Sequence, residues 1–512
     1  MKRMIAVLLC VVLMVPLFGC STDEFVYVPT GDALVIDGES VPPTEDSNAK
    51  EQYLELAYYP NYSLNPYNAT NYVNRVLFSL VYQGLFALDS NYNSVPVLCK
   101  ALKVSNDMRT YVAYLEKASF SDGSAITVED VLASYEYAEK SQYYSGRFTH
   151  IAEMGITEDG GVAFYLDTAM ESLPMLLDIP IVKAEQVAEE RPLGSGPYFY
   201  EDASTGLRLR RRNDWWCSAD LQVTASSVPL VEVSSTITMR DSFEFGKVGV
   251  ALADPCADSY VEYRCDYELW DSDNGGFLYL AVNMQSKVFS NEGIRSALTY
   301  AVDREAINEA YYRGYAQPAS LPASPSSPYY SKKLAERYTY DIDKFIQAVT
   351  DNYMAGAEVK FIVNKDDTMR VRVARHIAED LRKSGLNVVL DELSTKGYKE
   401  SLKYHVYDIY LGQTKLSPNM DLTPFFRLYG NLSFGIINDS GLYSLCQQAL
   451  ANSGNYYNLH ETIMEDGRVV PVLFQVYSVH ATRGLLTDMI PARDNVFYYT
   501  LGKTLPDVLV ES

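Results

Sequence analysis

The sequence predicts an α/β fold that contains at least one pair of parallel strands joined by a helix. A run of strand-forming residues at 358–363 is followed at 369–383 by a helical pattern whose apolar residues recur on one face. Gly385 ends this helix, and a second strand follows at 388–390. A strand, a helix and a strand in this order form a crossover unit, which implies parallel strands.

A second group of predicted elements lies nearer the N-terminus. Residues 71–80 have the apolar spacing of a helix, and Gly84 lets the chain turn out of it. Asn106-Asp107 is a hairpin-type turn before a strand at 111–115. Thr127, with Asp130 three residues later, approximates a capping box, so a helix is expected to start there.

These elements carry short segments that together resemble one known family. The segments are Tyr82-Gln83-Gly84-Leu85, Pro96, Asn106-Asp107, Phe120-Ser121-Asp122-Gly123 and Thr127-Val128-Glu129-Asp130-Val131. Their order and spacing are similar to those of the extracellular solute-binding proteins of family 5, the receptors of ABC importers for oligopeptides, dipeptides and nickel complexes. The plain alternative is an ordinary helix, hairpin and helix of any α/β domain.

Residues 294–307 give a second match, similar to the family's Val-Arg-x-Ala-Leu-x-x-Ala-Ile-Asp-Arg segment. Their apolar residues share one face, so one amphipathic helix is expected. Asp303 and Arg304 are expected to form an ion pair that ends this helix, and a catalytic pair is the alternative. Leu193-Gly194-Ser195-Gly196-Pro197-Tyr198 resembles the family's Gly-Thr-Gly-Pro-Tyr turn. A phosphate-binding loop is rejected there, because Pro197 removes a backbone donor and no Lys-Ser/Thr follows.

The resemblance implies a two-lobed clamshell of the type II periplasmic-binding-protein kind, with an extra subdomain and mixed sheets flanked by helices. Such a protein closes around its ligand by a hinge motion. Lobe I is expected at 51–75, 190–275 and 476–512, the family-specific subdomain II at 76–189, and lobe II (domain III) at 276–475.

The N-terminus predicts a lipoprotein. Residues 1–19 read as a signal peptide, with Lys2-Arg3 before an apolar run. Leu17-Phe18-Gly19-Cys20 resembles a bacterial lipobox, so Cys20 is expected to carry lipid; a secretory peptide with a chance cysteine is the alternative. Residues 20–50 are polar and Pro-containing, as in a flexible tether. The predicted location is the outer face of the bacterial cytoplasmic membrane, extracytoplasmic or periplasmic.

Composition excludes several classes of function. The 512 residues carry a formal net charge of −23, which argues against nucleic acid or anionic lipid as the main partner. The five histidines are scattered and no catalytic motif is present, so no enzyme is expected. The cysteines lack paired C-x-x-C spacing, so neither a metal site nor a cofactor is predicted. Cys256 and Cys265 could close a short loop, or both could be buried thiols.

The ligand site is expected around the strand at 407–411 and the segment after it. In the family an aspartate in a Trp-x-x-Asp-like segment pairs with a peptide's α-ammonium. Here Gln413 stands for the tryptophan and Leu416 for the aspartate, while Lys415 adds a cation or faces solvent. Burying an unpaired ammonium costs several kcal/mol, about 3 or more, so free-amine peptides are disfavoured unless the loop rearranges to use Asp421. The predicted ligand-binding residues are Tyr82, Trp270, Phe277, Tyr279, Gln413, Thr414, Lys415, Leu416 and Asp421.

The sequence therefore predicts a monomeric, lipid-anchored receptor that delivers a peptide or peptide-like solute to the permease subunits of an ABC importer. One alternative is a related binding module without a transport role, such as a sensor or scavenger. Another is a receptor for a non-peptide solute such as a metal complex. A secreted enzyme is the third alternative, and no motif supports it.

Overall fold

The computed structural model describes residues 54–499 except 222, 256, 258, 487 and 488, together with residue 501 and the strand at 508–510. The expected signal peptide, Cys20 and the tether lie outside the described residues. Cys256 does too, so the two alternatives for Cys256 and Cys265, a closed loop or free thiols, stay untested. Within the described part of the chain, no helix is both long enough and apolar enough to cross a membrane.

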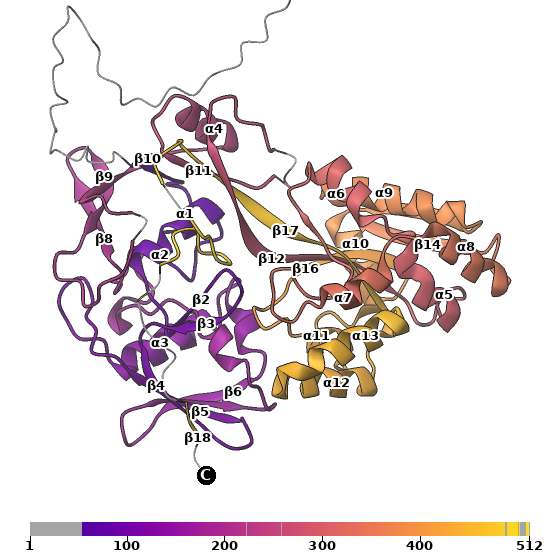
Figure 1. The fold of residues 1–512 in the computed structure, drawn as a ribbon, viewed down its shortest axis with the longest axis horizontal. Coiled ribbons are helices and arrows are strands. Elements are labelled where there is room, and N and C mark those ends of the chain that lie inside the picture. The colour runs from indigo at the N-terminus through magenta and orange to yellow at the C-terminus, as the bar shows by residue number, and fades with distance from the viewer. Residues whose placement is uncertain are drawn as a thin grey trace, which may run out of the picture. The chain divides into compact units, whose positions relative to one another are not determined.

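An eleven-stranded mixed sheet organises the chain (Figure 1). Ten of its strands follow one another in space in the order β15 (Asn387–Leu393), β14 (Glu358–Asn364), β16 (Ile409–Lys415), β12 (Glu268–Val282), β17 (Val469–Ala481), β11 (Val250–Ala253), β1 (Leu56–Tyr58), β10 (Ser227–Glu232), β9 (Gly206–Arg211) and β8 (Tyr198–Ala203). The short strand β13 (Gln317–Pro318) pairs with β17. The sheet is thus built from segments far apart in the sequence.

The long strands β12 and β17 join the two ends of this sheet. They pair antiparallel from Glu268 opposite Ala481 to Ala281 opposite Val469, with a register shift between Asp273 and Gly276. On one side β17 pairs with β11, and on the other β12 pairs with β16. The expected lobe boundaries at 275/276 and 475/476 therefore fall inside these two strands. The boundaries themselves stay a prediction.

The other strands form two smaller sheets, and helices cover the sheets. One sheet has the order β18 (Val508–Val510), β4 (Cys99–Val104), β5 (Thr110–Leu115), β7 (Val162–Leu166) and β6 (Ile151–Ile156), and β2 (Phe86–Leu88) pairs with β3 (Ser94–Pro96). The helices are α1 (Tyr72–Val76), α2 (Phe78–Val81), α3 (Val128–Ala138), α4 (Thr236–Glu244), α5 (Glu292–Ala297), α6 (Arg304–Tyr312), α7 (Lys332–Ala335), α8 (Ile342–Asp351), α9 (Thr368–Lys383), α10 (Thr395–Lys403), α11 (Thr423–Phe426), α12 (Ser440–Ala451) and α13 (Tyr456–Asp466).

Several local predictions are confirmed. β14 and β15 pair in parallel with α9 between them, so the crossover unit is present. Val359, Phe361 and Val363 of β14 point into a buried apolar cluster that α5, α8 and α9 complete. Thr127 caps α3 in a full capping box with Asp130. The helix expected at 71–80 is divided into α1 and α2, with Leu77 between them.

The expected helix at 294–307 is wrong. α5 ends at Ala297, a 3₁₀ turn covers Leu298–Ala301, and α6 begins at Arg304. Asp303 is the N-cap of α6, where its carboxylate accepts a hydrogen bond from the Ala306 amide, so it starts a helix instead of ending one. Arg304 is bound by backbone carbonyl groups and does not serve as its ion-pair partner.

Gly194 and Gly196 have a packing role. The Gly196 amide donates to the Val81 carbonyl at 2.9 Å. A Cβ atom added at Gly194 would lie 2.1 Å from that same carbonyl oxygen, a distance that no side chain could occupy. The two glycines therefore let this turn approach the end of α2 closely, which explains them without a phosphate.

Arg304 ties α6 to the crossing strands. It is 5% exposed, and its Nε donates to the carbonyl oxygens of Ala319 and Pro471, each at 2.9 Å. Desolvation lowers the pKa of this guanidinium to about 10. Arg304→Met is expected to lower the free energy of unfolding by roughly 3 kcal/mol, because it strands buried carbonyl groups without donors.

Urea unfolding would measure this loss for Arg304→Met, and the exposed Arg375→Met would serve as the matched control. Arg375 pairs with Glu392 on the surface, so its replacement is expected to change stability by about 0.5 kcal/mol or less. Equal stability of the two variants would contradict this role for Arg304.

Candidate solute-binding site

A cavity of about 440 Å³ lies where β12, β16 and β17 meet α1 and the C-terminal segment at 489–499. Its volume is in the range of small-molecule sites, about 300–1,000 Å³. We call it the central cavity. Its wall is made by Thr70, Tyr72, Arg75, Tyr143, Asn274, Gly276, Asp367, Arg370, Gln413, Thr414, Lys415, Gln475, Tyr477 and Asp494.

Two of the cavities that share walls with the central cavity bear on the site. The side cavity, of about 450 Å³, shares Asp367, Arg370, Gln413 and Gln475. The basic cavity, of about 110 Å³, shares Arg75, Tyr143 and Asp494, and is also lined by Tyr82, Arg147, Asp178 and Arg493. The three cavities therefore follow one another as neighbouring spaces.

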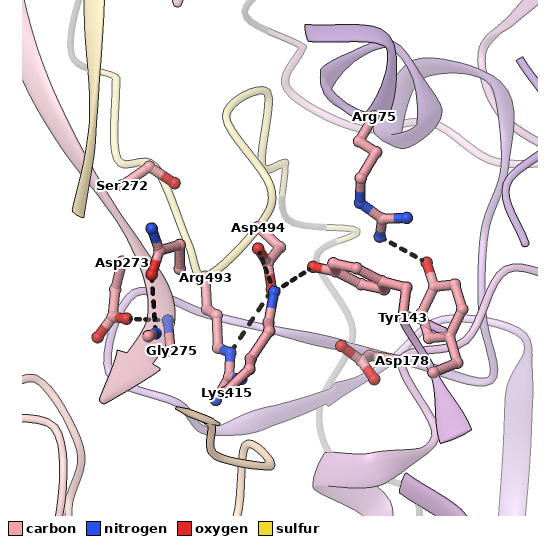
Figure 2. Close-up of polar contacts among 12 residues, drawn as sticks. Arg75, Tyr143, Asp178, Ser272, Asp273, Gly275, Lys415, Arg493 and Asp494 are labelled. Atoms are coloured by element: carbon pink, nitrogen blue, oxygen red, sulfur yellow. Dashed lines mark hydrogen bonds and ion pairs between the residues drawn. The ribbon is translucent and has the colours of Figure 1, made fainter. Parts of the chain in front are cut away.

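Lys415 lines the central cavity and contacts Tyr143 and Asp494, which line both the central and the basic cavity (Figure 2). Its Nζ lies 3.0 and 2.9 Å from the two carboxylate oxygens of Asp494 and donates to the Tyr143 hydroxyl at 2.8 Å. A third of the Lys415 side chain is exposed to solvent, whereas the Asp494 side chain is 12% exposed. The contact joins the end of β16 to the C-terminal segment.

The charges around this contact oppose one another. Loss of water lowers the pKa of Lys415 to about 7, because the attraction of Asp494 does not offset it and Arg493 and Arg75 add repulsion. Burial alone would raise the pKa of Asp494, but Lys415, Arg493 and Arg75 together lower it to about 2. Asp494 is therefore an anion at neutral pH, and more positive than negative charge surrounds it.

Only some of the N–H groups of Arg493 have a hydrogen-bond acceptor. It is 4% exposed, its Nη2 donates to the Leu416 carbonyl, and its Nε lies 3.6 Å from Asp494. Its Nε and Nη1 are buried and have no hydrogen-bond partner among the residues that the structure describes. Gly275, at φ +70°, makes room for this side chain, since an added Cβ would lie 2.2 Å from the Arg493 guanidinium.

Arg75 is held by aromatic rings and backbone. Its guanidinium carbon lies 3.0 Å from the centre of the Tyr143 ring, and its Nη2 donates to the Tyr144 hydroxyl at 3.2 Å. Weaker contacts of 3.4 and 3.5 Å join Nη1 to the carbonyl oxygens of Pro66 and Ala69. Within the described residues, none of these partners is a carboxylate.

Comparison with known proteins decides the family. Residues 93–434 match the model of the bacterial extracellular solute-binding proteins, family 5, middle region. This protein is a family 5 solute-binding protein. The family consists of binding proteins and not enzymes, and the predicted fold class and family are both confirmed.

Individual relatives are distant. The glutathione-binding protein GsiB of Salmonella choleraesuis (strain SC-B67) is 23% identical over 365 residues, which are 66% of this chain and 70% of that protein. The crystal structure of the ABC transporter substrate-binding protein CtaP from Listeria monocytogenes covers 88% of this chain and 99% of its own, with a TM-score of 0.70 and 20% identity. The oligopeptide-binding protein AppA from Bacillus subtilis, solved with a nonapeptide, covers the same shares with a TM-score of 0.58 and 18% identity.

Four of the predicted ligand-binding residues of this family 5 protein line the cavities. Gln413, Thr414 and Lys415 face the central cavity, and Tyr82 lines the basic cavity. The strand expected at 407–411 continues as β16 to Lys415, so these three residues belong to a strand and not to the loop after it. Gln413 donates to Gln475 of β17 at 2.8 Å.

The other predicted residues lie in packed surroundings. Phe277 and Tyr279 are buried and stack on each other with 5.3 Å between ring centres. Trp270 is half-buried against the N-terminal apolar cluster. The Leu416 side chain is buried, and only its carbonyl takes part in the site, as the acceptor from Arg493.

Asp421 is buried beside a histidine. One of its oxygens lies 3.1 Å from His150 Nε2, and the Thr423 hydroxyl also contacts both groups. On the other side, His150 Nδ1 lies 2.9 Å from Asp167. The acid that approaches Lys415 is Asp494 instead.

Sequence reasoning missed four residues at the centre of this site: Arg75, Tyr143, Arg493 and Asp494. Arg75 had a usable signal, because it is a charged residue among apolar neighbours in the expected helix at 71–80. Arg493-Asp494 is a charged pair just after the apolar Met489-Ile490-Pro491. Nothing in the local pattern shows that these segments meet β16.

His150 predicts a pH dependence of stability. Burial alone would lower its pKa, but the hydrogen bonds and charges of Asp421 and Asp167 raise it above the usual 6.5. A raised folded-state pKa stabilises the protein fully below pH 6.5, and this stabilisation is lost as the pH rises through the folded value. The difference in unfolding free energy between the wild type and His150→Gln is therefore expected to be largest at acidic pH and to shrink as the pH rises.

Urea titrations at several values between pH 5.5 and 8.5 would measure this difference. A difference independent of pH would contradict the assignment.

Proposed function

We propose that this protein is a lipid-anchored receptor that captures a peptide or peptide-like solute and delivers it to the permease of an ABC importer. The observation that carries the proposal is the central cavity, whose wall combines residues of both expected lobes. Arg75 comes from one expected lobe, and Gln413 and Lys415 come from the other. A solute placed there would touch both lobes at once, as hinge closure requires.

The crossing strands support the hinge. The register shift between Asp273 and Gly276 interrupts the β12–β17 ladder beside the cavity, and Gly275 there adopts a positive φ of +70°. Irregular pairing with a glycine is a position at which strands can bend. We place the hinge at this shift and at the facing residues of β17.

The type of solute is the least constrained part of the proposal. Relatives carry the names of a glutathione-binding protein and of an oligopeptide-binding protein that was solved with a nonapeptide. A peptide-like solute agrees with both names. Leu416, at the position of the family's ammonium-binding aspartate, favours a solute whose amine is blocked or absent.

Native mass spectrometry and small-angle X-ray scattering on protein purified from its own host would test this function. A retained small solute is expected, and its removal by partial unfolding and refolding should increase the radius of gyration. Adding the solute back should restore the compact form. Protein that retains no solute, together with a radius that no extract of the host's growth medium changes, would contradict a receptor role.

The anchor has a separate test. If Cys20 carries lipid, Cys20→Ser is expected to move the protein from the membrane fraction to the soluble fraction of the host, because no acyl chain remains to partition into the bilayer. Immunoblotting of the fractions measures this. Ser21→Ala is the control, and an unchanged distribution of Cys20→Ser would rule out anchoring through this residue.

A further inference from the structure

The central and basic cavities carry an excess of positive charge. Five basic side chains line them against three carboxylates, although the whole chain has a formal charge of −23. The basic residues are Arg75, Arg147, Arg370, Lys415 and Arg493, and the acidic ones are Asp178, Asp367 and Asp494. The formal local excess is therefore two positive charges.

Pairing assigns that excess to two particular residues. Arg147 forms a two-pronged contact with Asp178 at 2.5 and 2.7 Å, and Arg370 lies 2.7 Å from Asp367. Lys415 takes Asp494. Arg493 shares Asp494 with Lys415 through a longer contact of 3.6 Å, and Arg75 has no ion pair in the described part of the chain. Both side chains are less than a tenth exposed.

Burying a guanidinium whose N–H groups lack acceptors lowers the stability of the folded protein. A bound ligand that supplies an acceptor would remove this cost. Arg493 has two such nitrogen atoms and lines the basic cavity. Asp273 lies near it, but its oxygens already accept hydrogen bonds from Tyr92, Ser324 and the Gly275 amide. The acceptor that fits this position is an acid group brought by the solute.

We propose that the solute is a carboxylate-bearing molecule whose acid group binds at the junction of the central and basic cavities, against Arg75, Lys415 and Arg493. This inference rests on the proposed receptor function and names its class of solute. Asp494 contacts part of this basic surface and would compete with the incoming carboxylate. The rest of the solute extends through the central cavity.

The charge distribution fixes the orientation. The side cavity is acidic, since Asp254, Asp366 and Asp367 face it with Arg370 as the one basic residue among its described lining residues. An acid group is repelled from that end and attracted to the basic end. An ammonium group is disfavoured at Asp494, because Lys415, Arg493 and Arg75 around this carboxylate would repel it.

Four forms of trialanine test the proposal by isothermal titration calorimetry. The amine is free or acetylated, and the carboxyl is free or amidated, so the two charges vary independently. Amidation is expected to weaken binding at least about tenfold, and acetylation to cost less than amidation, because the site holds partners for an anion. Citrate and inorganic phosphate, added to the same protein, distinguish a carboxylate site from a general anion site, and citrate is expected to bind more tightly.

Variants with opposite expected effects keep misfolding from explaining the result. Lys415→Gln is expected to weaken binding of the acid forms at least about tenfold, because it removes one cation of the site. Asp494→Asn is expected to tighten it about threefold or more, because the competing carboxylate is gone. Arg375→Gln, an equal change of charge on the exposed face of α9, is expected to leave affinity unchanged.

Each remaining outcome overturns the inference. The inference is overturned if amidation costs no more affinity than acetylation, if phosphate binds more tightly than citrate, or if Asp494→Asn weakens binding of the acid forms. It is also overturned if none of the acids binds. The receptor function is judged separately, by the solute retained from the host: a neutral or cationic solute there would remove the inference and leave the receptor intact.

Discussion

The antiparallel pairing of β12 with β17 is the constraint on which the rest of the structure depends. Within the described sheet, these two strands connect β11 and β1, on one side, to β16 and β14 on the other. They also place Asn274 and Gly276 of β12 beside Gln475 and Tyr477 of β17, all on the wall of the central cavity. The register shift between Asp273 and Gly276 lies at the same position along the two strands. The strands that join the two expected lobes therefore also line the cavity proposed as the binding site.

The site holds several charged side chains that are largely removed from water. A partly buried ion pair such as Lys415–Asp494 adds little net stability, because moving the two charges out of water costs about as much as their attraction returns. In this site the pair places Lys415 beside Arg75 and Arg493, which aromatic rings and backbone carbonyl groups hold in place. Together these three residues form a basic surface. An arginine held in place loses less conformational entropy when it binds an anion than a free surface arginine would.

Local structure was largely predictable from the sequence, because it depends on neighbouring residues. The crossover from β14 through α9 to β15 follows from apolar periodicity and Gly385, and the start of α3 follows from Thr127 and Asp130. The break between α5 and α6 was missed, because the apolar face continues through the 3₁₀ turn at Leu298–Ala301 and Asp303 caps a new helix. Periodicity alone does not record such a change of axis.

The site was predicted only in part, since its key contacts join segments far apart in the chain. The family resemblance led to Gln413–Lys415, but the contact of Lys415 with Asp494 spans 79 residues and that with Tyr143 spans 272. Neither contact is indicated by the sequence near the residues that form it. Phe277 and Tyr279 were predicted to bind ligand. They stack on each other, and Phe277 also stacks on Phe474, which comes from β17.

A crystal structure of the protein with the solute retained from its host tests the central claim most directly. The account predicts a solute in the central cavity with an acid group within hydrogen-bond distance of Arg75, Arg493 or Lys415, and with contacts to residues on both sides of the β12–β17 pair. A solute whose amine lies against Asp494, or one bound away from this cavity, would contradict it.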